Sequence, residues 1–352
     1  MRVRSSVRPV LRRVAAGTFG SNDSVSNVRS NAQGEDRQPL VLVALSGGAD
    51  SLALAAALAA EGPGAGVRAG AVIIDHGLQS GSAAVASRAA EQARDLGLDP
   101  VVVRRVVVGD GDGPEAAARA ARYEALAATA SELGCGVVLT AHTRDDQAEQ
   151  VLLALARGSG TRSIAGIPLQ REIVPGVFVA RPLLTEQYEV TRAVTEASCA
   201  ELALAPWRDP HNADPTYTRV RVRTTVLPML ERELGWGFGA ALARSADLAR
   251  EDADALDAIA EAHLGALMSG GGEDQPVRLS IEALRALPAA LLGRVIRLVA
   301  ARVFDSQLTR EHTLAIASLV TGWKGQGPIH APGIVVKREA GELVFCSREL
   351  LQ

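Results

Sequence analysis

The chain has 352 residues, of which 47% are hydrophobic and 34 are glycine, so it is long enough to bury a sizeable core and to divide into two or three units. A formal net charge of −3 excludes broad, non-specific binding to nucleic acid, and a 3% share of aromatic residues argues against a base-stacking platform. Any contact with RNA must therefore come from a local basic patch.

The first 39 residues are expected to precede the core. The first twenty contain arginines but no acidic residue, which suggests either a transit peptide or a short surface helix, predicted over Val7–Ala16. The next stretch, Gly20–Pro39, is polar and has almost no periodicity, so it predicts a flexible segment.

A strand, a tight turn and a helix start follow in Val41–Ser51, which reads V-L-V-A-L-S-G-G-A-D-S and leads into the apolar run Leu52–Ala60. The turn offers backbone N–H groups and two hydroxyls at a helix N-terminus, where the helix dipole favours an anion. It lacks the pattern G-x-x-x-x-G-K-[ST] and has no lysine near it, so it is not a Walker-type loop. We predict a phosphate site formed by Ser46, Gly47, Gly48, Ala49, Asp50 and Ser51.

The hexapeptide S-G-G-A-D-S resembles the PP-loop of the N-type ATP pyrophosphatases, which split ATP into AMP and pyrophosphate. The resemblance implies ATP as a cofactor together with Mg²⁺, held partly by Asp50. The alternative is an ordinary Gly-Ser turn between a strand and a helix.

A second buried strand is predicted over Ala69–Asp75, after a turn at Gly62–Gly66. It ends in Asp75 and His76, and the carboxyl ends of neighbouring parallel strands form the crevice that holds ligands. Asp75 is therefore a candidate for a ribose hydroxyl or a metal, and His76 for the adenine. The alternative is that Asp75 only caps the next turn.

Two more strand–helix units are indicated. A helix is expected over Ser82–Leu96, followed by a strand over Pro100–Val108 whose apolar residues suggest burial. A turn at Asp110–Pro114 then leads into a second helix over Glu115–Leu133. On the last helix, Arg119, Arg122 and Tyr123 share a face, and spacing alone would make them solvated.

The fourth strand, Cys135–Thr140, leads into A-H-T-R-D-D-Q-A-E-Q, which starts a helix. His142 and Asp146 share a face of that helix, as do Asp146 and Glu149. The pattern H-x-x-D-D is a weak signal for a zinc site. Two acidic residues at the start of a helix often do no more than interact favourably with the helix dipole. Four such units predict an α/β fold with a right-handed, doubly wound parallel sheet.

An ordered series of motifs between Leu40 and about Leu230 resembles the tRNA(Ile)-lysidine synthetase family. The motifs are S-G-G-A-D-S, I-D-H-G-L, E-A-A-A-R-A-A-R-Y, A-H-T-R-D-D-Q-A-E, R-G-S-G, R-P-L-L, W-R-D-P-H-N-A-D and Y-T-R-V-R-V-R. The chain departs from the family pattern at Gln150, His211, Val220 and Thr224, which puts substrate affinity in question more than reaction type.

The resemblance implies a two-step reaction on the wobble cytidine of an isoleucine tRNA with a CAU anticodon. ATP first adenylates the C2 oxygen of the base, and the ε-amine of free L-lysine then displaces AMP. The implied lysine ligands are Asp146 and Glu149, with His142 and Arg122 lining the site. Asp146, Glu149 or His142 could take the proton of the lysine ammonium, and the sequence does not choose among them.

Contacts with tRNA are expected from Arg208, Arg219, Arg221 and Arg223, because R-V-R-V-R concentrates cations in a mildly acidic chain. The alternative is a solvated strand or helix face. Rival functions are a tRNA thiolation enzyme, a PP-loop ligase that uses ammonia, and a nucleotide-binding regulator without turnover.

The C-terminal part is predicted to be a mainly helical region followed by a small α+β region. We expect a helix over Gly235–Met268 and a linker over Ser269–Pro276. Helical stretches near Ser280–Ala301 and Thr309–Thr321 follow, and then a hairpin over Ile334–Phe345 that turns at Ala340-Gly341. The predicted division of the chain is 1–39, 40–230, 231–268 and 269–352. The oligomeric state stays open, with a dimer as one option.

Cysteine and lysine usage completes the sequence evidence. Cys135, Cys199 and Cys346 form no C-x-x-C pair and no metal-ligand spacing, which favours a reducing cytoplasm. No apolar run reaches the roughly 18 residues of a membrane helix, so no membrane contact is expected. The only lysines are Lys324 and Lys337, so phosphate binding elsewhere must rely on arginine, backbone amides and a metal ion.

Overall fold

The computed structural model describes residues 1–20, 38–77, 81–107, 114–268 and 275–348. Most of the predicted flexible segment, the predicted turn Asp110–Pro114 and most of the predicted linker Ser269–Pro276 lie outside these residues. The chain forms two compact units, Met1–Asp247 and Leu248–Gln352. Among the described residues, no helix is both long and apolar enough to cross a bilayer.

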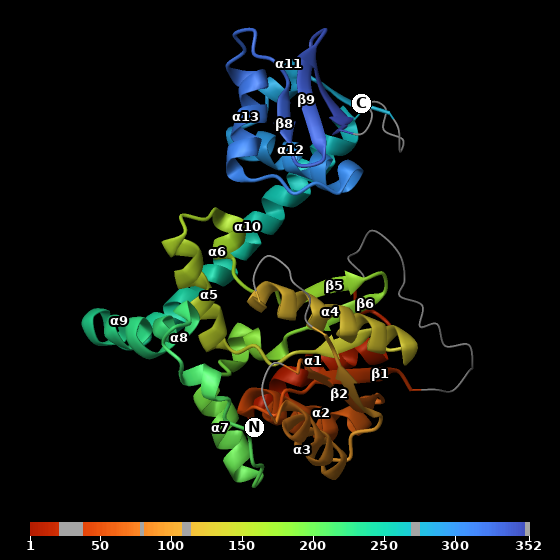
Figure 1. Ribbon diagram of the computed structural model, residues 1–352, viewed down its shortest axis with the longest axis vertical. Helices are drawn as coiled ribbons and strands as arrows, with labels where there is room; N and C mark the ends of the chain where they lie inside the picture. The colour runs from red at the N-terminus through yellow and green to blue at the C-terminus, as the bar shows by residue number, and fades with distance from the viewer. Residues whose placement is uncertain (21–37, 78–80, 108–113, 269–274, 349–352) are drawn as a thin grey trace. The chain divides into compact units, whose positions relative to one another are not determined.

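Unit 1 is built on a six-stranded sheet in the order β3-β2-β1-β4-β6-β5 (Figure 1). The strands are β1 (Leu40–Ala44), β2 (Arg68–Asp75), β3 (Val101–Arg105), β4 (Val137–Leu139), β5 (Gln170–Val174) and β6 (Val177–Ala180). All neighbouring pairs are parallel except β5 with β6, which form an antiparallel pair at one edge. The doubly wound parallel sheet is therefore confirmed, with the β5–β6 pair as an addition to it.

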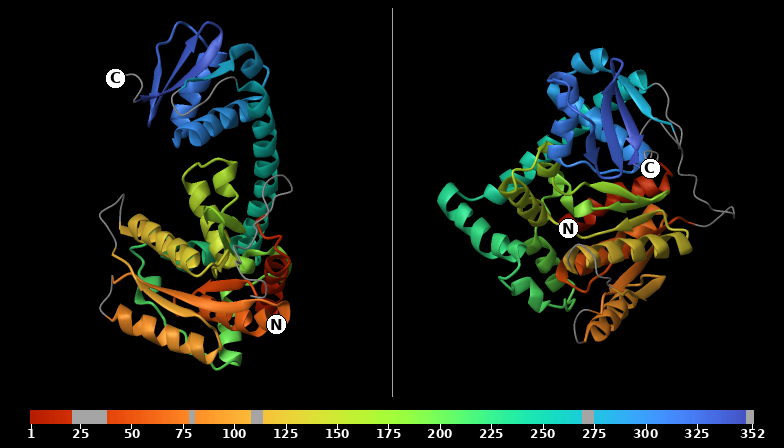
Figure 2. Two further views of the ribbon diagram at one scale, coloured as in Figure 1. Left: turned by 90° about the vertical axis from the view of Figure 1, so that its right-hand side faces the viewer. Right: turned by 45° about the horizontal axis from the view of Figure 1, so that its top comes forward.

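Helices cover both faces of this sheet (Figure 2). They are α1 (Arg2–Ala15), α2 (Ala49–Ala65), α3 (Ser82–Asp95) and α4 (Pro114–Glu132), while α5 (Arg144–Ala156) follows β4 and joins neither core of the sheet. Alternate residues of β1 point to opposite faces: Val41 and Val43 pack in one core with α1, α2 and α3, whereas Leu42 packs in another with Leu126 of α4. Burial on both faces explains why β1 is an unbroken apolar run.

Three sequence expectations are corrected here. The first helix is not a surface helix, because Val7 and Leu11 are fully buried against the core. The predicted turn at Gly62–Gly66 is the last turn of α2, which ends at Gly66 with φ +75°. The third strand is not buried, because β3 lies at the edge of the sheet and Val103 is 43% exposed.

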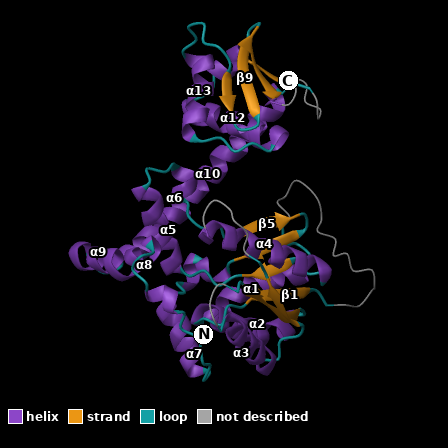
Figure 3. Cartoon of the chain, in the orientation of Figure 1, coloured by secondary structure: helices purple, strands orange, loops and turns teal. Residues whose placement is uncertain are grey.

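The rest of unit 1 is helical and irregular (Figure 3). Its elements are α6 (Thr161–Ile164), η1 (Pro182–Leu184), η2 (Glu186–Tyr188), α7 (Arg192–Glu201), η3 (Pro210–Ala213), α8 (Thr218–Arg221), the π-helical turn η4 (Val222–Val226), α9 (Leu227–Leu234) and the start of α10 (Phe238–Leu267). Helix α7 packs on α2, which brings its first residues close to the PP-loop.

Unit 2 contains a four-stranded antiparallel sheet in the order β7-β10-β9-β8. Its elements are β7 (Val277–Ser280), α11 (Ile281–Arg285), α12 (Ala289–Phe304), α13 (Arg310–Thr321), β8 (Ile329–Ala331), β9 (Ile334–Glu339) and β10 (Glu342–Ser347). The predicted hairpin is confirmed as β9–β10, and its turn residues Ala340 and Gly341 both have positive φ. The mainly helical region and the α+β region match the predicted fold class, whereas the four-part division stays a prediction.

Candidate active site

The PP-loop, Ser46–Ser51, connects β1 to α2 and is shaped by its own two hydroxyls. The Ser51 hydroxyl accepts a hydrogen bond from the Ser46 N–H at 3.2 Å, donates to the Gly48 carbonyl at 3.0 Å and lies 3.1 Å from the Ser46 hydroxyl. Gly47 has φ +84°, a conformation that suits glycine. The N–H groups of the first turn of α2 have no intrahelical acceptor, so the loop is equipped to bind a phosphate.

A cavity of about 310 Å³ lies beside this loop. The Trp207 N–H donates to the Gly47 carbonyl at 2.9 Å, which fixes the segment after α7 against the loop. Nδ1 of His76 is buried in the wall of the cavity and has no hydrogen-bond partner in the structure. Burial, aided by the nearby charge of Arg122, lowers the pKa of His76, so its imidazole is neutral and able to bond a base edge.

Asp75 lines the same cavity and also stabilises the turn that follows β2. Its carboxylate accepts a hydrogen bond from the Gly77 N–H at 3.0 Å. Hydrogen bonds from Ser82 and from that N–H hold the pKa of Asp75 below its ordinary value. The two interpretations of Asp75 are therefore compatible, because one carboxylate both caps the turn and faces the cavity.

Four arginines gather near Tyr123 of α4, and we call them the cation cluster: Arg119 and Arg122 of α4, Arg171 of β5, and Arg181, which directly follows β6. The Tyr123 hydroxyl accepts hydrogen bonds from Arg181 at 3.1 Å and from Arg119 at 3.4 Å, and the guanidinium of Arg171 lies 5.9 Å from the ring centre. Arg122 also lines the 310 Å³ cavity. Burial and its arginine neighbours lower the pKa of Arg122, and no described carboxylate forms an ion pair with it. A partly buried guanidinium without a counter-ion favours an anionic ligand.

His142 lies close to this cluster. Burial first, and then the charges of Arg181 and Arg122, lower the pKa of His142 well below its ordinary value, so the ring is neutral at neutral pH. Its Nδ1 is 3.2 Å from the Thr140 hydroxyl. Arg122 thus lies near enough for its charge to act on His142, although the two residues are 20 positions apart in the sequence.

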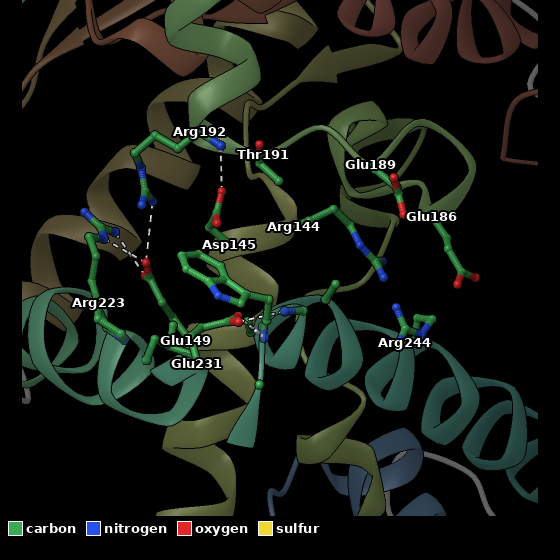
Figure 4. Close-up of a pocket in the computed structure, with 18 of the residues that line it drawn as sticks. Arg144, Asp145, Glu149, Glu186, Glu189, Thr191, Arg192, Arg223, Glu231 and Arg244 are labelled. Carbon is green, nitrogen blue, oxygen red and sulfur yellow. Dashed lines mark hydrogen bonds and ion pairs between the residues drawn. The ribbon is translucent and has the colours of Figure 1, made fainter. Parts of the chain in front are cut away.

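Asp146 and Glu149 form an acid–arginine network with Arg192, Arg219 and Arg223. Glu149 is fully buried, and its carboxylate accepts hydrogen bonds from Arg223 at 2.7 and 3.0 Å, from Arg219 at 2.9 Å and from Arg192 at 3.5 Å. One carboxylate oxygen of Asp146 lies 3.3 to 3.7 Å from the same three guanidinium groups. Figure 4 shows Glu149 between Arg192 and Arg223.

Asp50 connects the PP-loop to this network. One oxygen accepts a hydrogen bond from the Thr195 hydroxyl, and the other lies 3.9 Å from Nε of Arg192. Burial raises the pKa of Asp50 to about 6, and the charge of Asp146 adds to the rise, although the Thr195 hydrogen bond opposes it. The sequence analysis missed Arg192 and Thr195, which belong to no motif and reach the loop only because α7 packs on α2.

A second cavity, of about 840 Å³, shares Glu149, Arg192 and Arg223 in its wall (Figure 4). Glu231 fixes one side, because its carboxylate accepts hydrogen bonds from three successive N–H groups at Gly237–Gly239. The remaining wall includes acidic residues, an exposed aromatic side chain and further arginines, namely Asp145, Glu186, Glu189, Trp236, Arg2, Arg144, Arg232 and Arg244. The wall therefore carries charged side chains of both signs.

The four arginines that the sequence assigns to tRNA lie in different surroundings. Arg208 is exposed, and Arg221 is exposed and donates to the carbonyls of Pro215 and Thr216. Arg219 and Arg223 lie in the acid–arginine network, beside the residues assigned to lysine. The structure thus brings part of the predicted RNA surface and the predicted lysine site together.

The residues around Asp50 fit a magnesium ion carried by a nucleotide. No cluster of three or more potential metal ligands from His, Cys, Asp or Glu occurs among the described residues, so a metal site made of protein groups alone is not formed there. Mg²⁺ commonly uses one or two carboxylates together with substrate phosphates. A single carboxylate beside a phosphate-binding loop matches that pattern.

Comparisons with known proteins agree with this geometry. A family model described as a PP-loop domain matches residues 22–230, and one described as a TilS substrate binding domain matches residues 279–344. The U34-tRNA thiolase NcsA from Methanococcus maripaludis has a similar fold, with a TM-score of 0.51 and 16% identity over 70% of this chain and 80% of that one. That level of identity supports a likeness of fold alone.

Close relatives define the family. The tRNA(Ile)-lysidine synthase of Leifsonia xyli is 53% identical over 87% of this chain and 89% of its own length. The corresponding protein of Streptomyces coelicolor is 49% identical over 91% of this chain and 89% of its own. That of Thermobifida fusca is 46% identical over 94% of this chain and 92% of its own. With that identity over nearly its whole length, and with both domain models matched, the chain belongs to the tRNA(Ile)-lysidine synthase family.

Proposed function

We propose that this protein is an ATP-consuming ligase that converts the wobble cytidine of an isoleucine tRNA with a CAU anticodon into lysidine. The observation that carries the proposal is that a PP-loop lies beside two carboxylates, the fully buried Glu149 and the partly buried Asp146, and is joined to them through Arg192. The names of the relatives support the same activity. ATP would be cleaved to AMP and pyrophosphate.

In the first step, the C2 oxygen of the cytidine attacks the α-phosphorus of ATP, and pyrophosphate leaves. His76 and Asp75 would bind the adenosine part in the 310 Å³ cavity, and the PP-loop would bind the phosphates. Mg²⁺ held partly by Asp50 would neutralise charge on the leaving pyrophosphate. Loop N–H groups stabilise that charge as well, and removal of one such donor typically costs on the order of 3 kcal/mol in barrier height.

The cation cluster supports RNA as the other substrate of this step. Four guanidinium groups gather around Tyr123, and none of them has an ion pair with a described carboxylate. Such a cluster suits the phosphates of an RNA backbone, which a chain with a net charge of −3 would otherwise repel. Neutral His142 lies within this field and offers a hydrogen bond to the target base.

In the second step, the ε-amine of lysine attacks C2 of the adenylated base, and AMP leaves. The 840 Å³ cavity offers a route for lysine, because it leads to Glu149 and because Asp145, Glu186 and Glu189 lie among the charged side chains of both signs in its wall. Lysine in solution has a side-chain pKa near 10.4, and only the neutral amine attacks. Asp146, Glu149 or His142 would take the proton.

The experiment that tests the function is direct. The protein is incubated with ATP and tRNA carrying the CAU anticodon, and each amino acid is added separately. Lysine alone should become attached to RNA, with one AMP and one pyrophosphate released per attachment, and the Asp50→Asn variant should release little pyrophosphate. Attachment of any other amino acid would overturn the proposal.

A tRNA thiolation activity is less well supported by the described residues. Burial raises the pKa of Cys135 and of Cys199 to about 11, so neither thiol is a ready nucleophile at neutral pH. All three cysteines are free in the structure, and Cys346 belongs to unit 2. A regulator without turnover would bind ATP but release no AMP in the experiment above.

A further inference from the structure

The carboxylate of Glu149 has no capacity left for a lysine ammonium. Its two oxygens receive four N–H contacts at 2.7 to 3.5 Å from three arginines, which fills the lone-pair sites of a carboxylate. The side chain is 0% exposed. An ammonium can therefore reach Glu149 only if at least one guanidinium leaves.

Asp146 is occupied in the same way. One oxygen accepts hydrogen bonds from the Thr143 N–H and hydroxyl at 2.8 and 3.1 Å, which completes the capping box of α5. The other oxygen faces Arg192, Arg219 and Arg223. With Asp50 counted, three carboxylates thus face three guanidinium groups, so the network holds no uncompensated negative charge to attract a further cation.

Two of these arginines differ from the third in anchoring but not in exposure, since Arg192 is 26% exposed. Arg219 and Arg223 are 34% and 23% exposed and come from α8 and the π-helical turn η4, an irregular element of a kind often found at functional sites. The backbone N–H of Arg192 is anchored by Asp145 at 2.6 Å, and its side chain also faces Asp50. A polyanion can therefore contact Arg219 and Arg223, which lack the contact with Asp50 that holds Arg192.

We propose that Arg219 and Arg223 occupy the ammonium site of lysine until RNA phosphates draw them away, so that tRNA opens Asp146 and Glu149 to lysine. The change is an exchange of ion pairs, from guanidinium–carboxylate to guanidinium–phosphate and ammonium–carboxylate. It reconciles the two sequence predictions for these residues, since the same arginines contact RNA and guard the lysine site. The inference rests on the proposed function and adds an order of binding, RNA before lysine.

Linkage in the unmodified protein gives the first test, with ATP omitted so that no turnover occurs. The dissociation constant of radiolabelled lysine is measured by equilibrium dialysis with and without saturating tRNA. We expect lysine to bind on the order of tenfold more tightly with tRNA, and lysine to tighten tRNA binding by the same factor, because coupling between sites is reciprocal. Equal lysine affinity in both states would overturn the inference.

The variant Arg219→Gln/Arg223→Gln gives the second test. Glutamine keeps a neutral N–H donor for Glu149, which limits the cost of leaving a buried carboxylate poorly paired. Lysine should bind this variant without tRNA about as tightly as it binds the wild type with tRNA. The matched control is Arg12→Gln/Arg94→Gln, which removes two exposed arginines of α1 and α3 and should keep the tRNA dependence. Lysine binding to the first variant that is as weak as to the free wild type would contradict the inference.

The outcomes separate this inference from the proposed function. If lysine binds the protein equally well with and without tRNA, and the enzyme still attaches lysine to the tRNA, the inference fails and the proposed function stands. If lysine binds neither the free protein nor its complex with tRNA, and another amino acid is attached to the tRNA, the inference and the proposed function both fail. Circular dichroism verifies that the double variant is folded, and if it is not, the linkage measurement on the wild type decides alone.

Discussion

Asp50 is the residue at which the PP-loop meets the acid–arginine network. Its pKa of about 6 lies above the ordinary 3.8, so the native state binds this proton more tightly than the unfolded chain does. Between these two values, the free energy of unfolding therefore falls as the pH rises. At neutral pH the protein keeps an ionised, largely buried carboxylate, which the proposed magnesium ion would use.

The variant Asp50→Asn tests this cost. We expect it to raise the free energy of unfolding at pH 7.5 by up to about 3 kcal/mol and to leave it nearly unchanged at pH 4. Denaturant unfolding of both proteins at the two pH values measures the effect, and equal stability at pH 7.5 would contradict it. The same variant should lose Mg²⁺-dependent release of pyrophosphate, so stability and activity change in opposite directions.

Glu149 is predicted to serve the second step more than the first. The variant Glu149→Ala should slow lysine attachment by at least about tenfold, the usual effect of losing a hydrogen bond to a charged group, and should change adenylation of the tRNA less. Single-turnover measurements of pyrophosphate release and of lysine attachment separate the two steps. An equal loss of rate in adenylation and in lysine attachment would contradict the assignment of Glu149 to the lysine site.

At the residue scale, sequence motifs could predict the PP-loop and the acids but not their partners. Ser46–Ser51 and Asp146 lie in contiguous motifs whose local geometry follows from helix starts. Arg192 depends on contacts with residues more than 40 positions away, through the packing of α7, and no local pattern encodes such contacts. The pairing of Arg219 with Glu149 spans 70 positions for the same reason.

At the element scale, α1 shows how composition can mislead. Its arginines suggest a surface helix, yet Val3, Val7 and Leu11 recur every four residues and form a buried stripe. Its basic face is not wholly solvated either, because Arg4 and Arg8 both bond Glu61 of α2. The missed β5–β6 pair has a local signal as well, since a Pro-Gly turn separates two β-branched runs.

Substitution in α1 should therefore behave as a core mutation. The variant Leu11→Ala removes a fully buried side chain and should lower the free energy of unfolding of unit 1 by about 2–5 kcal/mol. The neighbouring Arg12→Ala, at an exposed position, should change it by less than about 0.5 kcal/mol. Denaturant titration compares the two, and a neutral Leu11→Ala would mean that α1 is not part of the core.

At the scale of the whole molecule, the charge is distributed unevenly. The chain is mildly acidic, but the cation cluster concentrates guanidinium groups that no described acid neutralises. Electrostatic attraction of RNA should therefore depend on few residues, and each phosphate contact contributes about 0.7 to 0.9 to the slope of log affinity against log salt. A parallel sheet was accessible from the sequence, whereas this clustering was not, because its members lie on α4, on β5 and directly after β6.

The double variant Arg119→Gln/Arg171→Gln tests this distribution. Both side chains are exposed, so the substitution should leave stability nearly unchanged. The salt dependence of tRNA binding, measured between about 50 and 200 mM salt, should become shallower by about one to two units of slope. An unchanged slope would exclude these two arginines from the RNA contact.

The scarcity of lysine has a consequence for an enzyme that uses an amine as its nucleophile. Unit 1 contains no lysine, so its cationic side chains, histidines aside, are all guanidinium groups, which stay protonated below about pH 12 and do not attack an activated base. A lysine in the same place would present the functional group of the free substrate, already tethered beside the adenylated cytidine. With arginine in place of lysine, unit 1 can bind RNA phosphates through side chains that do not react covalently with the adenylated cytidine.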